Sequence, residues 1–139
     1  MKKYKIQVYN GIYFTVEFYQ DCQKNIPAFD YYEELTKKEK VRFFALIGKL
    51  ADSPYGKFLP EHMYRLEDPE NFIYALKFDN NRYLNFTTID KKIIITNGFK
   101  KKTQKLGRRE KEALSFAIKA KRDYIKRVKE ETYYVRDSI

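Results

Sequence analysis

The sequence contains few of the residues on which common catalytic and metal sites depend. Its 139 residues include one cysteine, Cys22, and one histidine, His62. A single cysteine excludes an internal disulfide and a cysteine-based metal site. Serine–histidine and cysteine–histidine catalysis would have to share the one histidine. Nucleophilic catalysis of these kinds is therefore not expected.

Glycine-rich motifs and carboxylate clusters are scarce too. The five glycines are scattered and never take the spacing of a Walker loop or a dinucleotide-binding motif. Glu67, Asp68 and Glu70 lie together, but in a proline-containing stretch that is typical of a turn. We therefore expect no metal site and no cofactor.

Long apolar runs are also missing. No stretch of about 20 apolar residues is present, so neither a transmembrane helix nor a membrane partner is expected. The basic N-terminus, MKKYKIQVYNGIYF, is interrupted by Gln7 and Asn10 and makes a poor signal peptide. These features predict a cytoplasmic protein. With 43% hydrophobic and 17% aromatic residues, the chain is expected to fold as one domain over residues 1–139.

Acidic residues are scarce in one part of the chain only. Residues 1–99 carry 15 basic and 13 acidic side chains, whereas residues 100–129 carry 13 basic and 3 acidic ones. Nearly the whole net charge of +10 thus comes from one contiguous segment. Such a segment attracts polyanions through long-range attraction and counterion release, or it meets an acidic protein.

The N-terminal half reads as a strand pair followed by two helices. Alternating apolar and polar residues predict strands at 4–9 and 12–19, with Asn10-Gly11 as a tight turn of the primed type. Pro27 suits the first turn of a short helix. A second helix is expected over about residues 37–52, and the two helices together form a helical hairpin.

The second helix has a clear start signal and an apolar stripe. Thr36 is expected to be its N-cap, and Glu39 completes a capping box. The residues expected to be buried are Val41, Phe44, Leu46, Ile47 and Leu50.

Four extended segments and a long helix follow. Their connections are too short for parallel crossovers, so the strands are expected to be antiparallel neighbours: 62–67, 71–78, 82–89 and 92–99. From Gly107 to about Glu131 the spacing predicts an amphipathic helix with a stripe of Ala113, Ala117, Ala120, Tyr124 and Val128. The fold class is α+β, with an N-terminal strand and helical hairpin, a curved antiparallel sheet and a long basic C-terminal helix.

The chemistry that remains is cationic and phenolic. RNA can be cut without a metal, because its own 2′-hydroxyl lies next to the phosphate. The protein must then move protons and neutralise the crowded phosphorane, and Lys and Arg side chains are suited to the second task. Aromatic side chains can stack on bases that are splayed out.

Several stretches resemble one family. FALIGKLADSPYGKFLP (44–60), YRLEDPENFIYALKF (64–78) and EALSFAIKAKRDYIKR (112–127) are similar to segments of the RelE/HigB toxin superfamily of type II toxin–antitoxin modules. The most specific likeness is NGFKKKTQK (97–105), which is typical of the phage-derived RelE-like, HigB-type branch. The resemblance implies a ribosome-dependent, metal-independent endoribonuclease that cleaves translated mRNA. It also implies a cognate antitoxin, of helix-turn-helix HigA-like type, as a partner besides the ribosome and mRNA.

The resemblance also marks candidate site residues. The catalytic candidates are Lys77, Arg82, Tyr83, Lys101 and Lys102. The candidates for RNA or ribosome binding are Lys100, Lys105, Arg108, Arg109, Lys119, Arg122 and Lys126. Either Arg82 or Tyr83 corresponds to the family's strand arginine. Strand alternation would place Lys101 and Lys102 on opposite faces, so that at most one of them enters the site.

The match departs from the family at several positions, which keeps other functions open. Lys77 stands where the family has an arginine, and Ile73 and Ala75 stand where RelE has two lysines. Gly107 falls about where a tyrosine is expected. The alternatives are a ParE-like toxin that inhibits DNA gyrase and a catalytically weak remnant that still binds its antitoxin.

Overall fold

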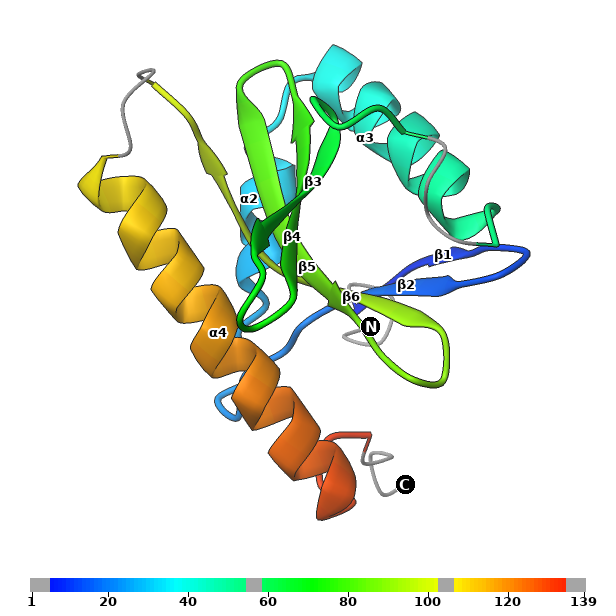
Figure 1. Ribbon diagram of the computed structural model, residues 1–139, viewed down its shortest axis with the longest axis vertical. Coiled ribbons are helices and arrows are strands. Elements are labelled where there is room, and N and C mark those ends of the chain that lie inside the picture. Colours follow the sequence, from blue (N-terminus) through cyan, green and yellow to red (C-terminus); the bar gives the residue numbers. More distant parts are fainter. Residues whose placement is uncertain (1–5, 55–58, 103–106, 135–139) are drawn as a thin grey trace.

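The computed structural model describes residues 6–54, 59–102 and 107–134. Its helices are α2 (Pro27–Glu33), α3 (Lys37–Ala51) and α4 (Arg108–Lys129). Its strands are β1 (Gln7–Asn10), β2 (Thr15–Phe18), β3 (Tyr64–Asp68), β4 (Ile73–Phe78), β5 (Asn81–Thr87) and β6 (Lys92–Lys100). They form one sheet in the order β1-β2-β6-β5-β4-β3 (Figure 1). The α+β class, the helical hairpin and the long C-terminal helix are confirmed.

The sheet is mixed rather than wholly antiparallel. Neighbouring strands run antiparallel except β2 and β6, which are parallel, with Val16 opposite Ile93. The short connections within β3–β6 do enforce antiparallel pairing, as the sequence predicts. β2 and β6, however, are separated by both α2 and α3 and three strands, a connection long enough for a parallel pair.

The sheet has a hydrophobic core on each face. α2 and α3 cover one face, where Phe43, Leu76 and Tyr83 belong to the same buried cluster. α4 crosses the other face, where Ile73, Ala75 and other buried residues form the second cluster (Figure 1). None of the helices in the described ranges is long and apolar enough to cross a membrane.

The N-terminal hairpin is confirmed, but the prediction of a two-residue turn between its strands is wrong. β1 ends at Asn10 and β2 begins at Thr15, so a four-residue loop joins them. The loop is docked on the end of α3: the N–H groups of Tyr13 and Phe14 both donate to the carbonyl of Ala51, at 2.9 and 3.0 Å. The last carbonyls of a helix have no intrahelical partners. The two N–H groups of the loop bond to one of these carbonyls, that of Ala51, and this contact favours the longer loop over a two-residue turn.

The start of α3 is as expected, but its buried face is rotated. Thr36 and Glu39 form the capping box, with the Glu39 N–H donating to Thr36 Oγ1 at 3.2 Å. Phe43 is fully buried, whereas Val41 is 72% exposed and Phe44 is 41% exposed. The prediction that Val41 and Phe44 are core residues is therefore wrong. α3 carries two apolar stripes, and only the one that contains Phe43 packs on the sheet.

α4 lies close to the sheet because its inner face is built from small residues. Ala113, Ala117 and Ala120 are buried there, together with Tyr124, as predicted. Val128 is 38% exposed, so its place in the buried stripe is a wrong prediction. The helix ends at Lys129, before the stripe's last turn can reach the sheet.

A candidate phosphate-binding pocket at the end of the sheet

Strand register brings three of the predicted catalytic residues onto one face of the sheet. Lys77 of β4 lies opposite Arg82 of β5, and Arg82 lies opposite Phe99 of β6. Lys101 comes two residues after Phe99, and its N–H donates to the carbonyl of Asn80 at 2.7 Å, which continues the pairing beyond β6. Because side chains alternate along a strand, these side chains share the face that α4 covers.

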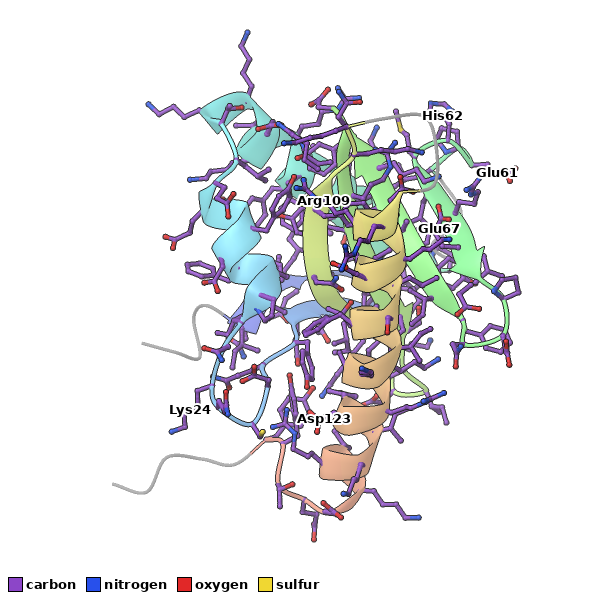
Figure 2. All side chains as sticks on the ribbon, turned by 90° about the vertical axis from the view of Figure 1, so that its left-hand side faces the viewer. Lys24, Glu61, His62, Glu67, Arg109 and Asp123 are labelled. Atoms are coloured by element: carbon purple, nitrogen blue, oxygen red, sulfur yellow. The ribbon has the colours of Figure 1, made fainter. Side chains whose placement is uncertain are left out.

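These side chains line a pocket of about 230 Å³ between the sheet and the start of α4. Its lining residues are Arg65, Glu67, Ala75, Lys77, Arg82, Leu84, Phe99, Lys101, Glu110 and Leu114. Figure 2 shows Glu67 at the same end of the molecule as Arg109, near the start of α4. The lining holds four cationic side chains and two carboxylates, so the pocket has an excess of positive charge.

One carboxylate is held by two of the cations. The Lys77 ammonium lies 2.9 Å from Glu67 Oε1, and Arg65 Nη2 lies 3.2 Å from both Glu67 oxygens. Burial by itself would raise the pKa of Glu67, but the hydrogen bonds from Lys77 and Arg65 outweigh it, so the pKa is below its ordinary value. Glu67 is therefore a carboxylate at neutral pH, fixed beside an ammonium group.

The other two cations are not neutralised. Within the described residues, neither Arg82 nor Lys101 forms an ion pair with a carboxylate. Arg82 Nη1 donates to the carbonyl of Asn81 at 3.0 Å, which leaves most of its donors for another partner. Burial lowers the pKa of Arg82, and the nearby carboxylates of Glu110 and Glu67 oppose that shift.

This arrangement suits a phosphodiester. Arg82 can offer a two-pronged grip on phosphate oxygens, Lys101 a point charge, and Phe99 an aromatic surface for a base. The Glu67 carboxylate can accept a proton from a neighbouring hydroxyl. The pocket thus combines charge stabilisation with a proton acceptor.

A comparison with protein-family models identifies the family to which most of the chain, including the pocket strands, is similar. Residues 30–119 match the model of the family described as phage-derived protein Gp49-like (DUF891). The match spans more than half of the chain and includes Lys77, Arg82 and Lys101. The chain belongs to the phage-derived Gp49-like family. This is a RelE/HigB-like toxin-type family, which agrees with the resemblance seen in the sequence, and it implies an antitoxin partner. The curated proteins contain no match to the chain.

Tyr83 lies on the opposite side of the sheet in this Gp49-like protein. Its side chain is fully buried, with its ring centroid 4.8 Å from that of Phe43 and 5.5 Å from that of Tyr31. Burial raises the pKa of its hydroxyl well above the ordinary value. A side chain that no substrate can reach cannot handle a proton of the RNA, so we correct its assignment from catalysis to packing. Of the two alternatives, only Arg82 lines the pocket.

Lys102 also lies outside the pocket. With Lys100 and Arg109 it lines a second hollow of about 490 Å³ on the other side of β6, beside Tyr31. The Lys100 ammonium lies 3.8 Å from Glu39 Oε2, at the start of α3. The expected alternation of Lys101 and Lys102 is confirmed, and Lys102 moves from the catalytic candidates to the surrounding basic surface.

The remaining basic candidates lie on the outer side of α4. Arg108, Lys119, Arg122 and Lys126 are all exposed, opposite the buried alanines of this helix. Arg108 forms an ion pair with Glu112 at 2.9 Å. Lys105 falls outside the described residues. The outer side of α4 is thus a continuous basic surface that begins beside the pocket.

Sequence reasoning missed three charged residues of the pocket: Arg65, Glu67 and Glu110. Glu67 ends the predicted strand 62–67 but was considered only together with the acidic turn that follows, whereas β3 extends to Asp68 and carries Glu67 within it. The alternation of Arg65 and Glu67 was the available signal, because β3 pairs with β4 and puts Arg65 opposite Ala75. Glu110 could not be predicted from strand alternation, because it lies on α4, which is distant in sequence from β3 and β4.

The donor groups of the described residues do not assemble a metal centre. Across 6–54, 59–102 and 107–134, no three His, Cys, Asp or Glu side chains gather in a position to hold an ion. His62 is exposed in the segment before β3 and does not line the pocket.

Proposed function

We propose that this protein is the toxin of a type II toxin–antitoxin module, of the HigB-type branch. It acts as a ribosome-dependent endoribonuclease that cleaves translated mRNA without a metal ion. The observation that carries the proposal is the pocket in which Arg82 and Lys101 have no carboxylate partner among the described residues, beside a Lys77–Glu67 ion pair. The likeness of the Gp49-like family to RelE/HigB toxins supports it.

The proposed reaction uses the RNA's own nucleophile. The 2′-hydroxyl oxygen forms a bond to the adjacent phosphorus while its proton passes to the Glu67 carboxylate. Arg82 stabilises the charge that builds up on the phosphorane oxygens. The bond from phosphorus to the 5′-oxygen then breaks, and the Lys101 ammonium protonates the leaving oxygen. The products are a 2′,3′-cyclic phosphate and a 5′-hydroxyl end.

The ribosome has a clear role in this proposal. The pocket supplies charge and a proton acceptor, but it has to receive mRNA in a bent, splayed conformation. In the decoding site the ribosome holds the mRNA in place. The basic outer side of α4 docks on ribosomal RNA phosphates and thereby brings the pocket to the message.

The test is to map mRNA 5′ ends in a reconstituted translation reaction, with and without ribosomes. The wild type is expected to create new ends in register with codons, only when ribosomes are present. Arg82→Ala/Lys101→Ala is expected to reduce cleavage by about 100-fold or more, because two groups that stabilise the transition state are lost. Lys24→Gln/Lys91→Gln removes two exposed cations outside the pocket and is expected to cleave like the wild type.

Two outcomes would contradict the proposal. An unchanged transcript with the wild type would sink it and direct attention to a gyrase supercoiling assay. Equal cleavage by the wild type and the Arg82→Ala/Lys101→Ala variant would show that the chemistry occurs elsewhere.

A further inference from the structure

We propose that the outer face of α3 is a docking surface for an acidic amphipathic helix of the antitoxin. This inference rests on the proposed function for the identity of the partner. The surface consists of Val41, Phe44, Ala45 and Gly48 with the cations that flank them, and we call it the α3 surface.

The α3 surface is an apolar stripe that stays exposed among the described residues. Val41 is 72% exposed and Phe44 is 41% exposed, and Ala45 is exposed between them. These residues have the i, i+3, i+4 spacing of a helix face made for contact. The core of this side of the sheet is already complete, because Phe43 and the residues in phase with it fill it. The second stripe is therefore free for a partner.

The large side chain of the stripe is held in place. The Phe44 ring packs edge-on against Tyr32 at 5.8 Å and against Phe43 at 5.5 Å between centroids. Its rotamer is restricted before any partner arrives, so binding loses little side-chain entropy. Fixed aromatic side chains of this kind are typical anchors of protein interfaces.

Gly48 points to a close approach by another element. A glycine inside a helix is destabilising relative to alanine. An added Cβ at Gly48 would meet only the end of the Tyr9 ring, at 3.6–3.7 Å, which is ordinary contact. Packing within the described residues therefore does not require glycine here. A partner helix that crosses α3 at Gly48, one turn beyond Phe44, would require a glycine there, because small residues let two helix backbones approach.

Charge decides which partner fits. The ionisable side chains of α3 other than Glu39 are all cationic: Lys37, Lys38, Lys40, Arg42 and Lys49. Glu39 is buried in the capping box and accepts from Asn81 at 2.6 Å, so it adds no exposed negative charge. A second copy of this chain would bring the same cations into contact and be repelled. A nucleic acid would gain nothing from Val41 and Ala45. An acidic helix with one apolar stripe matches both the apolar stripe of the α3 surface and the cations that flank it.

The α3 surface is separate from the pocket. α3 and α4 lie on opposite sides of the sheet (Figure 1). The pocket is lined by residues on the side of α4, including Glu110 and Leu114. Substitutions of Arg82 and Lys101 are therefore expected to leave antitoxin binding unchanged, and this makes the two proposals separable.

The experiment measures binding of the full-length toxin to the purified product of the reading frame adjacent to its gene, by calorimetry. Val41→Glu is expected to weaken binding by about 30-fold or more, because it places a carboxylate in an apolar contact beside an acidic partner. Gly48→Leu is expected to weaken it similarly by separating the two helices. Val41 is exposed and an added Cβ at Gly48 makes only ordinary contact with Tyr9, so both variants are expected to fold, and thermal unfolding of each checks this.

The matched controls are Ile89→Glu, at an apolar side chain 103% exposed between β5 and β6, and Ile125→Glu, 52% exposed on α4. Both are expected to bind within about twofold of the wild type. Hydrogen exchange of the complex is expected to show protection over residues 38–49.

Three results would overturn the inference. The first is wild-type affinity in both Val41→Glu and Gly48→Leu. The second is protection that falls on α4 and spares α3. The third is a wild-type toxin that binds no adjacent product, and this also removes the antitoxin partner. Cleavage of mRNA is measured independently, so a functional interferase with an insensitive α3 surface would contradict this inference alone.

Discussion

Individual cations of the pocket fall into two groups: Lys77 and Arg65 contact Glu67, and Arg82 and Lys101 form no ion pair among the described residues. Lys77 is bound to Glu67, whereas Arg82 and Lys101 keep their charge for a ligand. Lysine at position 77 places a compact ammonium against Glu67 Oε1, and Arg65 contacts both oxygens of the same carboxylate. Ile73 and Ala75 on the same strand are buried core residues, so β4 contributes a single cation to the pocket.

Tyr83→Phe separates the two interpretations of this tyrosine. Tyr83 Oη is buried without a hydrogen-bond partner among the described residues. Removing a buried hydroxyl that makes no bond is expected to leave the free energy of unfolding unchanged or raise it by about 1 kcal/mol. mRNA cleavage is expected to stay at the wild-type level. Denaturant unfolding and the cleavage assay check both points, and a 100-fold loss of cleavage in a folded variant would restore the catalytic assignment.

The Lys77–Glu67 ion pair is expected to make the stability of the protein depend on pH. The pKa of Glu67 is below its ordinary value of 4.5, so the pair contributes stability that is fully present above that pH. The contribution is lost as the pH falls through the folded-state pKa. Lys77→Met removes the stronger of the two hydrogen bonds and leaves burial, so the pKa of Glu67 is expected to rise. Carboxyl NMR titration of both proteins measures this, and an unchanged pKa would show that the pair does not control Glu67.

At the scale of elements, β6 organises the site. It pairs with β2 on one side and β5 on the other, and its end directs alternate side chains to opposite faces. Lys101 enters the pocket, while Lys100 and Lys102 line the second hollow. One strand end thereby supplies both the proposed catalytic charge and the surrounding basic surface.

Gly98→Ala tests how tightly β6 is packed. An added Cβ at Gly98 would lie 2.6 Å from the Tyr31 ring and 2.8 Å from the Tyr83 ring. Both rings are confined, so the variant is expected to lose about 1–3 kcal/mol in free energy of unfolding. Gly48→Ala is the control, because its added Cβ makes only ordinary contacts and the change is expected to be stabilising. Equal stability of Gly98→Ala and the wild type would show that the rings can move aside.

At the scale of the molecule, charge is arranged around the sheet in two separate places. The basic segment 100–129 runs from the end of β6 along the exposed side of α4. The cations of α3 lie on the opposite side of the sheet and flank an apolar stripe. The first pattern is dominated by exposed cations, which fits RNA phosphates. The second fits a protein.

A triple charge reversal on α4 is expected to weaken ribosome binding strongly, because it replaces three exposed cations on one face of the helix. The variant is Lys119→Glu/Arg122→Glu/Lys126→Glu. Each lost phosphate contact reduces the slope of log K against log salt by about 0.7–0.9, so the slope is expected to fall by about 2–3. Pelleting with ribosomes at several salt concentrations measures this. The thermal stability of the protein and its affinity for the antitoxin are expected to be unchanged. A slope equal to that of the wild type would exclude this face from ribosome docking.

Local signals in the sequence determined most of the elements and the chemistry of the candidate site. Proline at the start of α2, the capping box at Thr36 and the alanine stripe of α4 act within a few residues, so they can be recognised without the fold. The same holds for the lysine run 100–102, although only the structure decided that Lys101 rather than Lys102 lines the pocket. Only the tertiary structure decided which of two apolar stripes on α3 is buried, because both satisfy the helical period and the choice depends on the partner surface. Tertiary structure also decided that Arg82 rather than Tyr83 reaches the pocket and that Glu67 joins it, because strand register and the path of α4 depend on contacts between distant segments.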